Sequence, residues 1–259
     1  MTKNFRLILV TVFSVVFLSG AVATHVSAAD VGVGLGVAAV PDYEGSSNYE
    51  AAPLPYLTVR WDNNMNIRLI GGKLRSNLIP SDMWRGGVAA EYIGERDDVE
   101  NNKVDKLDDV DDSLMLGAFL GFESGRFIAD IEAMGDVNDG NDGTIVRFNL
   151  GYGIPVNNRS RLMLSGFTTW ADDDYMEAYF GVNERGARRS GLPVYKADSG
   201  IKDVGLNITY NCRPWENNWG FVGLAGYKLL VGDADDDSPV VDQGDENQLL
   251  GGIIVTYSF

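Results

Sequence analysis

The residue types that most often carry acid–base, nucleophilic or zinc chemistry are almost missing from this chain. His25 is the only histidine and Cys212 is the only cysteine. His25 lies in an amino-terminal segment that we expect to be removed on export, which would leave no histidine for a Ser–His or Cys–His pair or a histidine zinc site. A single cysteine forms no intramolecular disulfide. Carboxylates are plentiful, so a carboxylate pair stays open, but we predict a non-enzymatic protein without catalytic residues, cofactor or metal.

Three acidic stretches and one basic island are the remaining candidates for binding chemistry. Asp136–Gly143 is rich in oxygen ligands but lacks the spacing and closing Glu of an EF-hand, so a glycine-rich hairpin turn is favoured. Asp108–Asp112 and Asp233–Asp237 could bind Ca²⁺ weakly, although solvated acidic loops are the more common outcome. The basic island could meet lipopolysaccharide phosphates or lumenal carboxylates, or form a loop salt-bridge cluster. It consists of Arg185, Arg188 and Arg189.

The overall charge restricts the class of partner. The chain has 37 acidic against 21 basic residues and a formal net charge of −16. Such a chain repels the phosphate backbone, so nucleic acid is disfavoured as a partner.

The amino terminus has the form of an export signal. Lys3 and Arg6 precede the apolar run Leu7–Leu18, and small residues follow. The apolar run is too short to span about 30 Å of hydrocarbon. We therefore predict a signal peptide over residues 1–29, with Asp30 as the first mature residue and one domain over residues 30–259.

The carboxyl-terminal residues have the pattern of the closing strand of an outer-membrane β-barrel. Leu249, Ile253, Val255, Tyr257 and Phe259 share one face of a strand that ends in an aromatic residue. A closing strand pairs on both edges and faces lipid on one side. Tyr257 and Phe259 are accordingly predicted to act as an assembly signal for the barrel assembly machinery.

Period-2 alternation recurs along the chain and indicates strands with one apolar face. Val31–Ala39, Leu114–Phe122, Thr144–Tyr152 and Val204–Tyr210 all place large apolar side chains at every second position. Their other face carries Gly, Asn, Thr and Arg, as a crowded polar lumen requires. A sandwich would alternate in the same way, so the connections must decide.

The connections fall into two length classes, as in bacterial barrels with short periplasmic turns and long outer loops. The short turns lie at Asp62–Asn64, Glu123–Gly125, Asn157–Arg159 and Arg213–Asn218. The long loops lie at Pro41–Ala52, Asp97–Asp112, Asp136–Gly143, Asp172–Ser199 and Gly232–Asn247. The clear strands are odd in number, which would put the short turns on both sides of the membrane. A short strand at Lys73–Ile79 makes the number even and places the short turns on one side. We predict an all-β, transmembrane antiparallel up-and-down barrel of about 12 strands, each of roughly ten residues.

Several motifs, in order along the chain, resemble those of the MipA/OmpV (MltA-interacting protein) family of outer-membrane proteins. They are Pro41–Ser46, Asp174–Val182, Ser190–Tyr195, Leu230–Val241 and Asn247-Gln248. The resemblance runs from about Val31 to Phe259 and implies the outer membrane of a Gram-negative bacterium, with lipid and lipopolysaccharide around the barrel.

What the resemblance implies for function is a non-enzymatic scaffold that links the outer membrane to a murein transglycosylase and a murein synthase. Other members are described as antigens, adhesins or porin-like proteins, so a small-solute channel or a surface-binding, adhesin-like barrel is the alternative. The short turns offer little docking surface for the scaffold role.

One motif carries too many large apolar groups for a solvated loop. Tyr175, Met176, Tyr179 and Phe180 would leave an apolar patch if exposed. We expect this segment to fold over the barrel mouth as a lid, with Tyr179 and Phe180 buried; a partner-binding patch is the alternative. The chain is expected to turn back through Gly191, Leu192 and Pro193.

Overall fold

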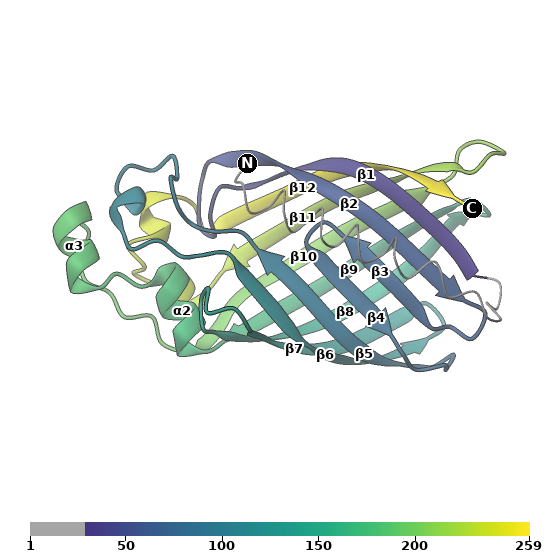
Figure 1. The fold of residues 1–259 in the computed structure, drawn as a ribbon, viewed down its shortest axis with the longest axis horizontal. Helices are drawn as coiled ribbons and strands as arrows, with labels where there is room; N and C mark the ends of the chain where they lie inside the picture. Colours follow the sequence, from purple (N-terminus) through teal and green to yellow (C-terminus); the bar gives the residue numbers. More distant parts are fainter. Residues whose placement is uncertain (1–28) are drawn as a thin grey trace.

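The computed structural model describes residues 29–259, which form a closed antiparallel barrel of twelve strands (Figure 1). The predicted fold class and strand number are therefore confirmed. The strands are β1 (Ala29–Pro41), β2 (Tyr49–Trp61), β3 (Asn66–Ile70), β4 (Lys73–Asn77), β5 (Trp84–Ile93), β6 (Ser113–Ser124), β7 (Phe127–Asp136), β8 (Thr144–Asn157), β9 (Ser160–Ala171), β10 (Gly200–Cys212), β11 (Trp219–Leu230) and β12 (Asn247–Ser258). The predicted signal peptide lies outside the described residues except for Ala29.

Consecutive strands pair with each other, and β12 closes the barrel against β1. Val37 lies opposite Ile253 on β12 and opposite Pro53 on β2. The apolar face identified by alternation is the outer face, where Leu35 and Leu206 are 65% and 63% exposed. The structure therefore places apolar side chains outward and polar ones in the lumen, as a membrane barrel requires. No helix in the described part of the chain is long and apolar enough to cross a membrane.

Long loops gather at one end of the barrel and short turns at the other, as predicted. The loop end carries residues 42–48, 94–112, 137–143, 172–199 and 231–246, and the turn end carries residues 62–65, 78–83, 125–126, 158–159 and 213–218. Within the loops lie helices α2 (Asp173–Phe180) and α3 (Glu184–Ser190) and short 3₁₀ turns at Val104–Lys106, Gly232–Ala234 and Val241–Gln243. Figure 1 shows both α-helices beyond the loop end, opposite the carboxyl terminus.

The expectation that every strand has roughly ten residues is wrong for one hairpin. β3 and β4 have five residues each, and β4 ends at Asn77, before the predicted Ile79. Where the strand ends, the Asn77 amide donates to the carbonyl oxygens of Asn64 and Ile79 at 2.9 and 3.1 Å. Pro80 follows and has no N–H for a ladder.

The orientation of the barrel gives the first testable prediction. Cysteines at Asp111 in a long loop and at Asn158 in a short turn, in a Cys212→Ser background, should differ in their reaction with an impermeant maleimide on whole cells. Asp111 and Asn158 are both exposed, so accessibility depends only on the side of the membrane. We expect labelling at Asp111 alone, because long loops face outside in bacterial barrels. Labelling at Asn158 alone would reverse the orientation.

The carboxyl-terminal aromatic gives a second prediction. The Phe259 N–H donates to the Val31 carbonyl at 2.8 Å, and the Phe259 ring lies 5.1 Å from that of Tyr257. Deleting Phe259 removes one exposed ring and one hydrogen bond, so the folded barrel should lose only about 1–2 kcal/mol. If Phe259 also serves as an assembly signal, the heat-modifiable, membrane-inserted fraction should fall far more than this small destabilisation explains. Normal insertion at native expression would contradict the assembly role.

Candidate functional site

The barrel encloses a cavity of about 2320 Å³ that runs from the turn end to the loop end. Arg213 and Asn217 line it at the turn end, and Tyr43 and Tyr175 line it beneath the loops. Two ion-pair clusters cross this lumen, and helix α2 stands above them. These three features form the candidate functional site.

Helix α2 fills part of the mouth with apolar side chains. Asp172 caps the helix by accepting from the Tyr175 N–H at 3.1 Å, which sets the first turn. Tyr175, Met176, Tyr179 and Phe180 are all buried, Met176 and Phe180 completely. They pack on lumen-facing side chains from the upper parts of β6 to β9 and from β11, namely Met115, Met134, Ile145, Ala171 and Leu230. The burial expected for Tyr179 and Phe180 is thus found, in a short helix.

After α2 the loop continues through α3, turns at Gly191 and runs back toward β10. Gly191 has φ +76° after α3, a left-handed conformation that favours glycine, and Val182 then pairs with Tyr195. Leu192 is buried in a second apolar cluster among the loops, whereas Pro193 is exposed. The buried Arg96 guanidinium ties the loops together by donating to the carbonyls of Tyr179 and Asp108 at 2.9 and 3.0 Å.

The upper ion cluster links the first loop to the wall and to α2. Lys202 and Lys228 both donate to Glu44, and the Tyr175 hydroxyl donates to the same carboxylate at 3.0 Å. Burial alone would raise the pKa of Glu44, but the two lysines outweigh it and hold that pKa below its usual value. Burial and the Glu44 carboxylate raise the pKa of Tyr175, so its hydroxyl stays protonated and can donate. Lys202 also pairs with Asp203 at 2.8 Å.

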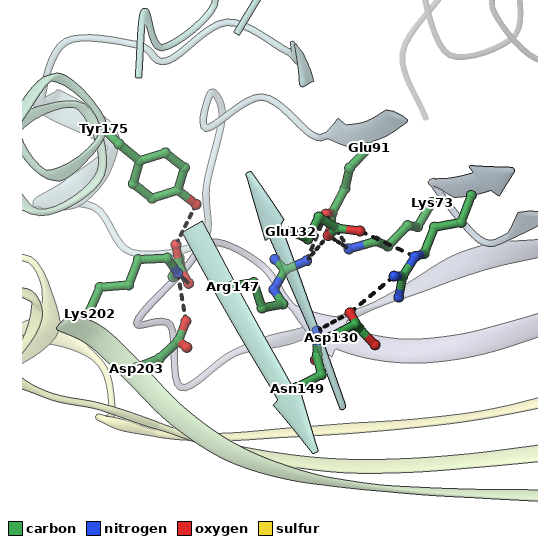
Figure 2. Close-up of polar contacts among 11 residues, drawn as sticks. Lys73, Glu91, Asp130, Glu132, Arg147, Asn149, Tyr175, Lys202 and Asp203 are labelled. Atoms are coloured by element: carbon green, nitrogen blue, oxygen red, sulfur yellow. Dashed lines mark hydrogen bonds and ion pairs between the residues drawn. The ribbon is translucent and has the colours of Figure 1, made fainter. Parts of the chain in front are cut away.

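The middle ion cluster joins four strands across the lumen (Figure 2). Glu132 on β7 has a fully buried side chain and contacts Lys73 on β4, with Arg147 on β8 at 3.3 Å and Arg75 on β4 at 3.3 Å. Glu91 on β5 pairs with Lys73 and Arg147 at 3.1 and 3.0 Å.

The formal charges in the middle cluster balance. Asp130 accepts from Arg75 at 3.0 Å, so three carboxylates face three cations. The positions follow from period 2, because Lys73 and Arg75, like Asp130 and Glu132, are two residues apart on one strand and point to the same side.

Sequence reasoning missed both ion clusters. The available signal was a charge at an inward-facing position of a strand, as at Glu91, Glu132 and Arg147. Which charges meet, however, depends on the register of four strands that are distant in sequence.

The acidic stretches form loops whose polar groups hydrogen-bond within the protein. Asp136 accepts from the N–H groups of Asn138, Asn141 and Asp142, so Asp136–Gly143 is the hairpin turn predicted. Tyr195 places its hydroxyl 3.0 Å from the carbonyls of Asp233 and Asp236. Residues 29–259 contain no group of three or more metal-ligating side chains arranged to hold a metal ion.

The basic island forms the loop salt-bridge cluster that was one of its predicted outcomes. Arg185 and Arg189 bind Asp108 at 2.8 and 2.6 Å, and Arg188 pairs with Glu184 at 3.4 Å. Hydrogen bonds from Arg185 and Asn183 lower the pKa of Asp108 to about 2.

The Asp108 cluster gives a third prediction. Asp108→Asn should speed tryptic cleavage after Arg185 and Arg189 by about threefold, because exposed ion pairs contribute up to about 1 kcal/mol. Asp111→Asn is the matched control, since Asp111 is an exposed acid of the same loop. Acidification should likewise loosen α3, as followed by hydrogen exchange, because a carboxylate with a lowered pKa stabilises the fold above its ordinary pKa and loses that effect as the pH falls toward about 2. Equal cleavage rates of the two variants would show that Asp108 does not hold α3.

Comparison with known proteins adds a family and several relatives. A family model described as MltA-interacting protein MipA matches residues 33–259. The MltA-interacting protein of Escherichia coli (strain K12) is 26% identical over 234 residues, covering 88% of this chain and 89% of the relative. A protein named "Putative outer membrane protein YiaT", from the same strain, is 23% identical over 249 residues, covering 95% of this chain and 96% of the relative.

Solved structures with a similar fold include the COG4313 outer membrane channel of Pseudomonas putida F1. It has 11% identity and a TM-score of 0.43, and the match covers 93% of this chain and 98% of that one. The NanC porin has 12% identity and a TM-score of 0.45, and the match covers 90% of this chain and 100% of that one.

Proposed function

The chain belongs to the MltA-interacting protein MipA family, and from that membership we propose that it is a non-catalytic scaffold for a murein transglycosylase. The barrel lies in the outer membrane, and its turn end is the side that a periplasmic enzyme would meet. A murein synthase would be the second partner of such a scaffold.

The observation that carries this proposal is an exposed aromatic side chain in a turn at the turn end. Trp215 lies in the turn of residues 213–218, is 52% exposed and packs edge-on against Phe221 at 5.5 Å. Most other turns at this end are shorter, so this turn and the open lumen beside it supply the docking surface that short turns otherwise lack. Exposed tryptophans are frequent anchors of protein interfaces.

Binding to a purified lytic transglycosylase tests the proposal. The mature barrel in nanodiscs should bind the enzyme, and Trp215→Ala should weaken binding by about tenfold or more, as for an interface anchor. Trp219→Ala is the matched control, because Trp219 is 46% exposed on the wall and packs against Tyr257. Absence of binding by the unaltered barrel, or an equal loss in both variants, would refute the docking site.

A small-solute channel is the second candidate, and the continuous polar lumen favours it. Planar-bilayer recordings separate the two: a scaffold whose mouth is filled by α2 should give at most brief openings, whereas steady conductance indicates a channel. Surface binding through the basic island has less support, since Arg185 and Arg189 are already occupied by Asp108.

The lid role of α2 belongs to this proposal. The apolar side chains of α2 pack inside the barrel mouth. This packing supports the role of α2 as a lid on the lumen more than the role of an exposed partner-binding patch.

A further inference from the structure

One hairpin of the barrel is too short to cover the membrane. β3 and β4 have five residues each, whereas the flanking strands β2 and β5 have 13 and 10. Five residues rise about 17 Å along a strand, and less along a tilted barrel, against an apolar band about 25 Å tall. Figure 1 shows β3 and β4 toward the turn end, with β2 and β5 continuing past them toward the loops.

Above this hairpin the wall is interrupted. Its last bonds to the flanking strands are from the Gly71 N–H to the Pro55 carbonyl, at 2.9 Å, and from the Tyr92 N–H to the Gly72 carbonyl, at 3.0 Å. In the described part of the chain, residues 49–54 of β2 pair only with β1. We call this interruption the notch; it is bounded by residues 49–54, Gly71-Gly72 and residues 92–94.

The open edge of β2 carries prolines where unpaired donors would otherwise face the notch. Because the Pro55 carbonyl points to the hairpin, Pro53, two residues away, presents its backbone to the same side. Proline has no N–H, so neither residue leaves an unsatisfied donor in lipid, where each such group costs several kcal/mol. The same lack of donors disfavours addition of a partner strand at this edge. At these two positions the edge is therefore suited to remain unpaired, whereas Ala51, two residues further along, still presents an N–H to the notch.

The notch opens onto the lumenal cavity, and most of its boundary is small or apolar, with Tyr49, Glu50 and Tyr92 as its polar members. The lumenal cavity is lined by Ala51, Pro53, Leu54, Gly71, Gly72 and Ile93, which all belong to the notch or flank it. An opening with such a rim, at the depth of the acyl chains, admits apolar chains more readily than hydrated solutes.

Below the rim stands a cation that forms no ion pair within residues 29–259, although the Asp130 carboxylate attracts it from a greater distance. Arg68 lies directly opposite Arg75 across the hairpin, and both line the lumen. Arg75 is neutralised by Asp130 and Glu132, but none of the ion pairs among residues 29–259 includes Arg68. Like charges directly opposite each other in a sheet are destabilising, and a bound anion would relieve this.

We propose that the notch is a lateral portal through which an anionic amphiphile passes between the surrounding lipid and the lumen, with its headgroup bound by Arg68. The apolar rim accommodates the acyl chain and Arg68 accommodates the negative charge, so the occupant is a lipid-like molecule rather than a protein strand.

Photolabelling in nanodiscs with a diazirine derivative of palmitate tests the portal. In the unaltered barrel we expect labels on lumen-facing residues near the notch, such as Leu54, as well as on the outer face at Leu206. A variant with Val-Thr inserted after Ile70 and Thr-Val inserted before Lys73 keeps the alternation and raises the hairpin by about 7 Å along each strand. Labelling at Leu54 should then fall to background while labelling at Leu206 stays unchanged.

Two further variants make the result independent of how well the longer hairpin folds. Ala52→Trp narrows the notch from the lumenal side of β2 without altering the hairpin, and should also reduce lumenal labelling. Arg68→Gln should reduce it about tenfold for palmitate but not for the corresponding neutral alcohol; Arg161→Gln, on a distant strand, is the control. Lumenal labelling that persists in both narrowed variants would overturn the portal, and equal labelling of Arg68→Gln and Arg161→Gln would overturn the anionic headgroup.

Discussion

Replacing Tyr179 and Phe180 together by alanine should release α2 from the barrel mouth. Phe180 is fully buried and Tyr179 is 4% exposed, both within the cluster that contains Met115 and Met134. Truncating a buried phenylalanine costs about 3–5 kcal/mol, which is comparable to the stability of a whole small domain and large for one loop. We expect faster proteolysis of residues 172–199 and longer, larger openings in planar bilayers.

The control for this pair should remove two aromatic rings without disturbing the mouth. Phe148→Ala/Tyr210→Ala does so, because both side chains lie on the outer face, 48% and 38% exposed. If proteolysis and conductance are unchanged in Tyr179→Ala/Phe180→Ala while transglycosylase binding is lost, the segment is a docking surface and the lid proposal is wrong.

The architecture of the barrel could be predicted because its determinants are local. Alternation over Leu114–Phe122 or Val204–Tyr210 assigns a face without knowledge of the neighbouring strand, and the sidedness of turns requires an even number of strands. The aromatic residues around Tyr179 indicated inward folding through composition alone. Their helical conformation could not be predicted with the same ease, because a helix of eight residues depends on tertiary packing.

The ion clusters and the notch depend on register, which a single strand does not reveal. Glu132 meets Lys73 across strands 59 positions apart in the chain. The turn at Gly71-Gly72 was not predicted: the sequence indicated a short strand at Lys73–Ile79, but spans of roughly ten residues were expected along the barrel. The difference is informative. Where the wall is incomplete at lipid depth, the open edge needs residues without a backbone N–H, and Pro53 and Pro55 are such residues.

Glu132→Gln should be the most destabilising single change in the lumen. It leaves Lys73, Arg75 and Arg147 facing only Glu91 and Asp130, with one cation in excess within the middle cluster. Breaking a buried ion pair costs about 3–5 kcal/mol, and partial exposure of Lys73 and Arg147, 26% and 20%, favours the lower value of about 3 kcal/mol. Urea unfolding in lipid vesicles, followed by heat modifiability, measures this loss. The same excess of positive charge should shift any residual conductance toward anions.

We infer that Glu132→Gln lowers stability because it unbalances the charges, and not because one side chain is lost. The double variant Glu132→Gln/Arg147→Gln tests this inference. The second change removes the surplus cation, so it should restore part of the stability lost in Glu132→Gln, with a coupling energy of about 0.5–3 kcal/mol between the two positions. Glu123→Gln is the matched single control, because within residues 29–259 the Glu123 carboxylate forms an ion pair only with Arg85 near the turn end, where its side chain is 20% exposed. If Glu132→Gln costs no more than Glu123→Gln, water in the lumen screens the cluster, and the middle ion pairs position side chains without holding the barrel together.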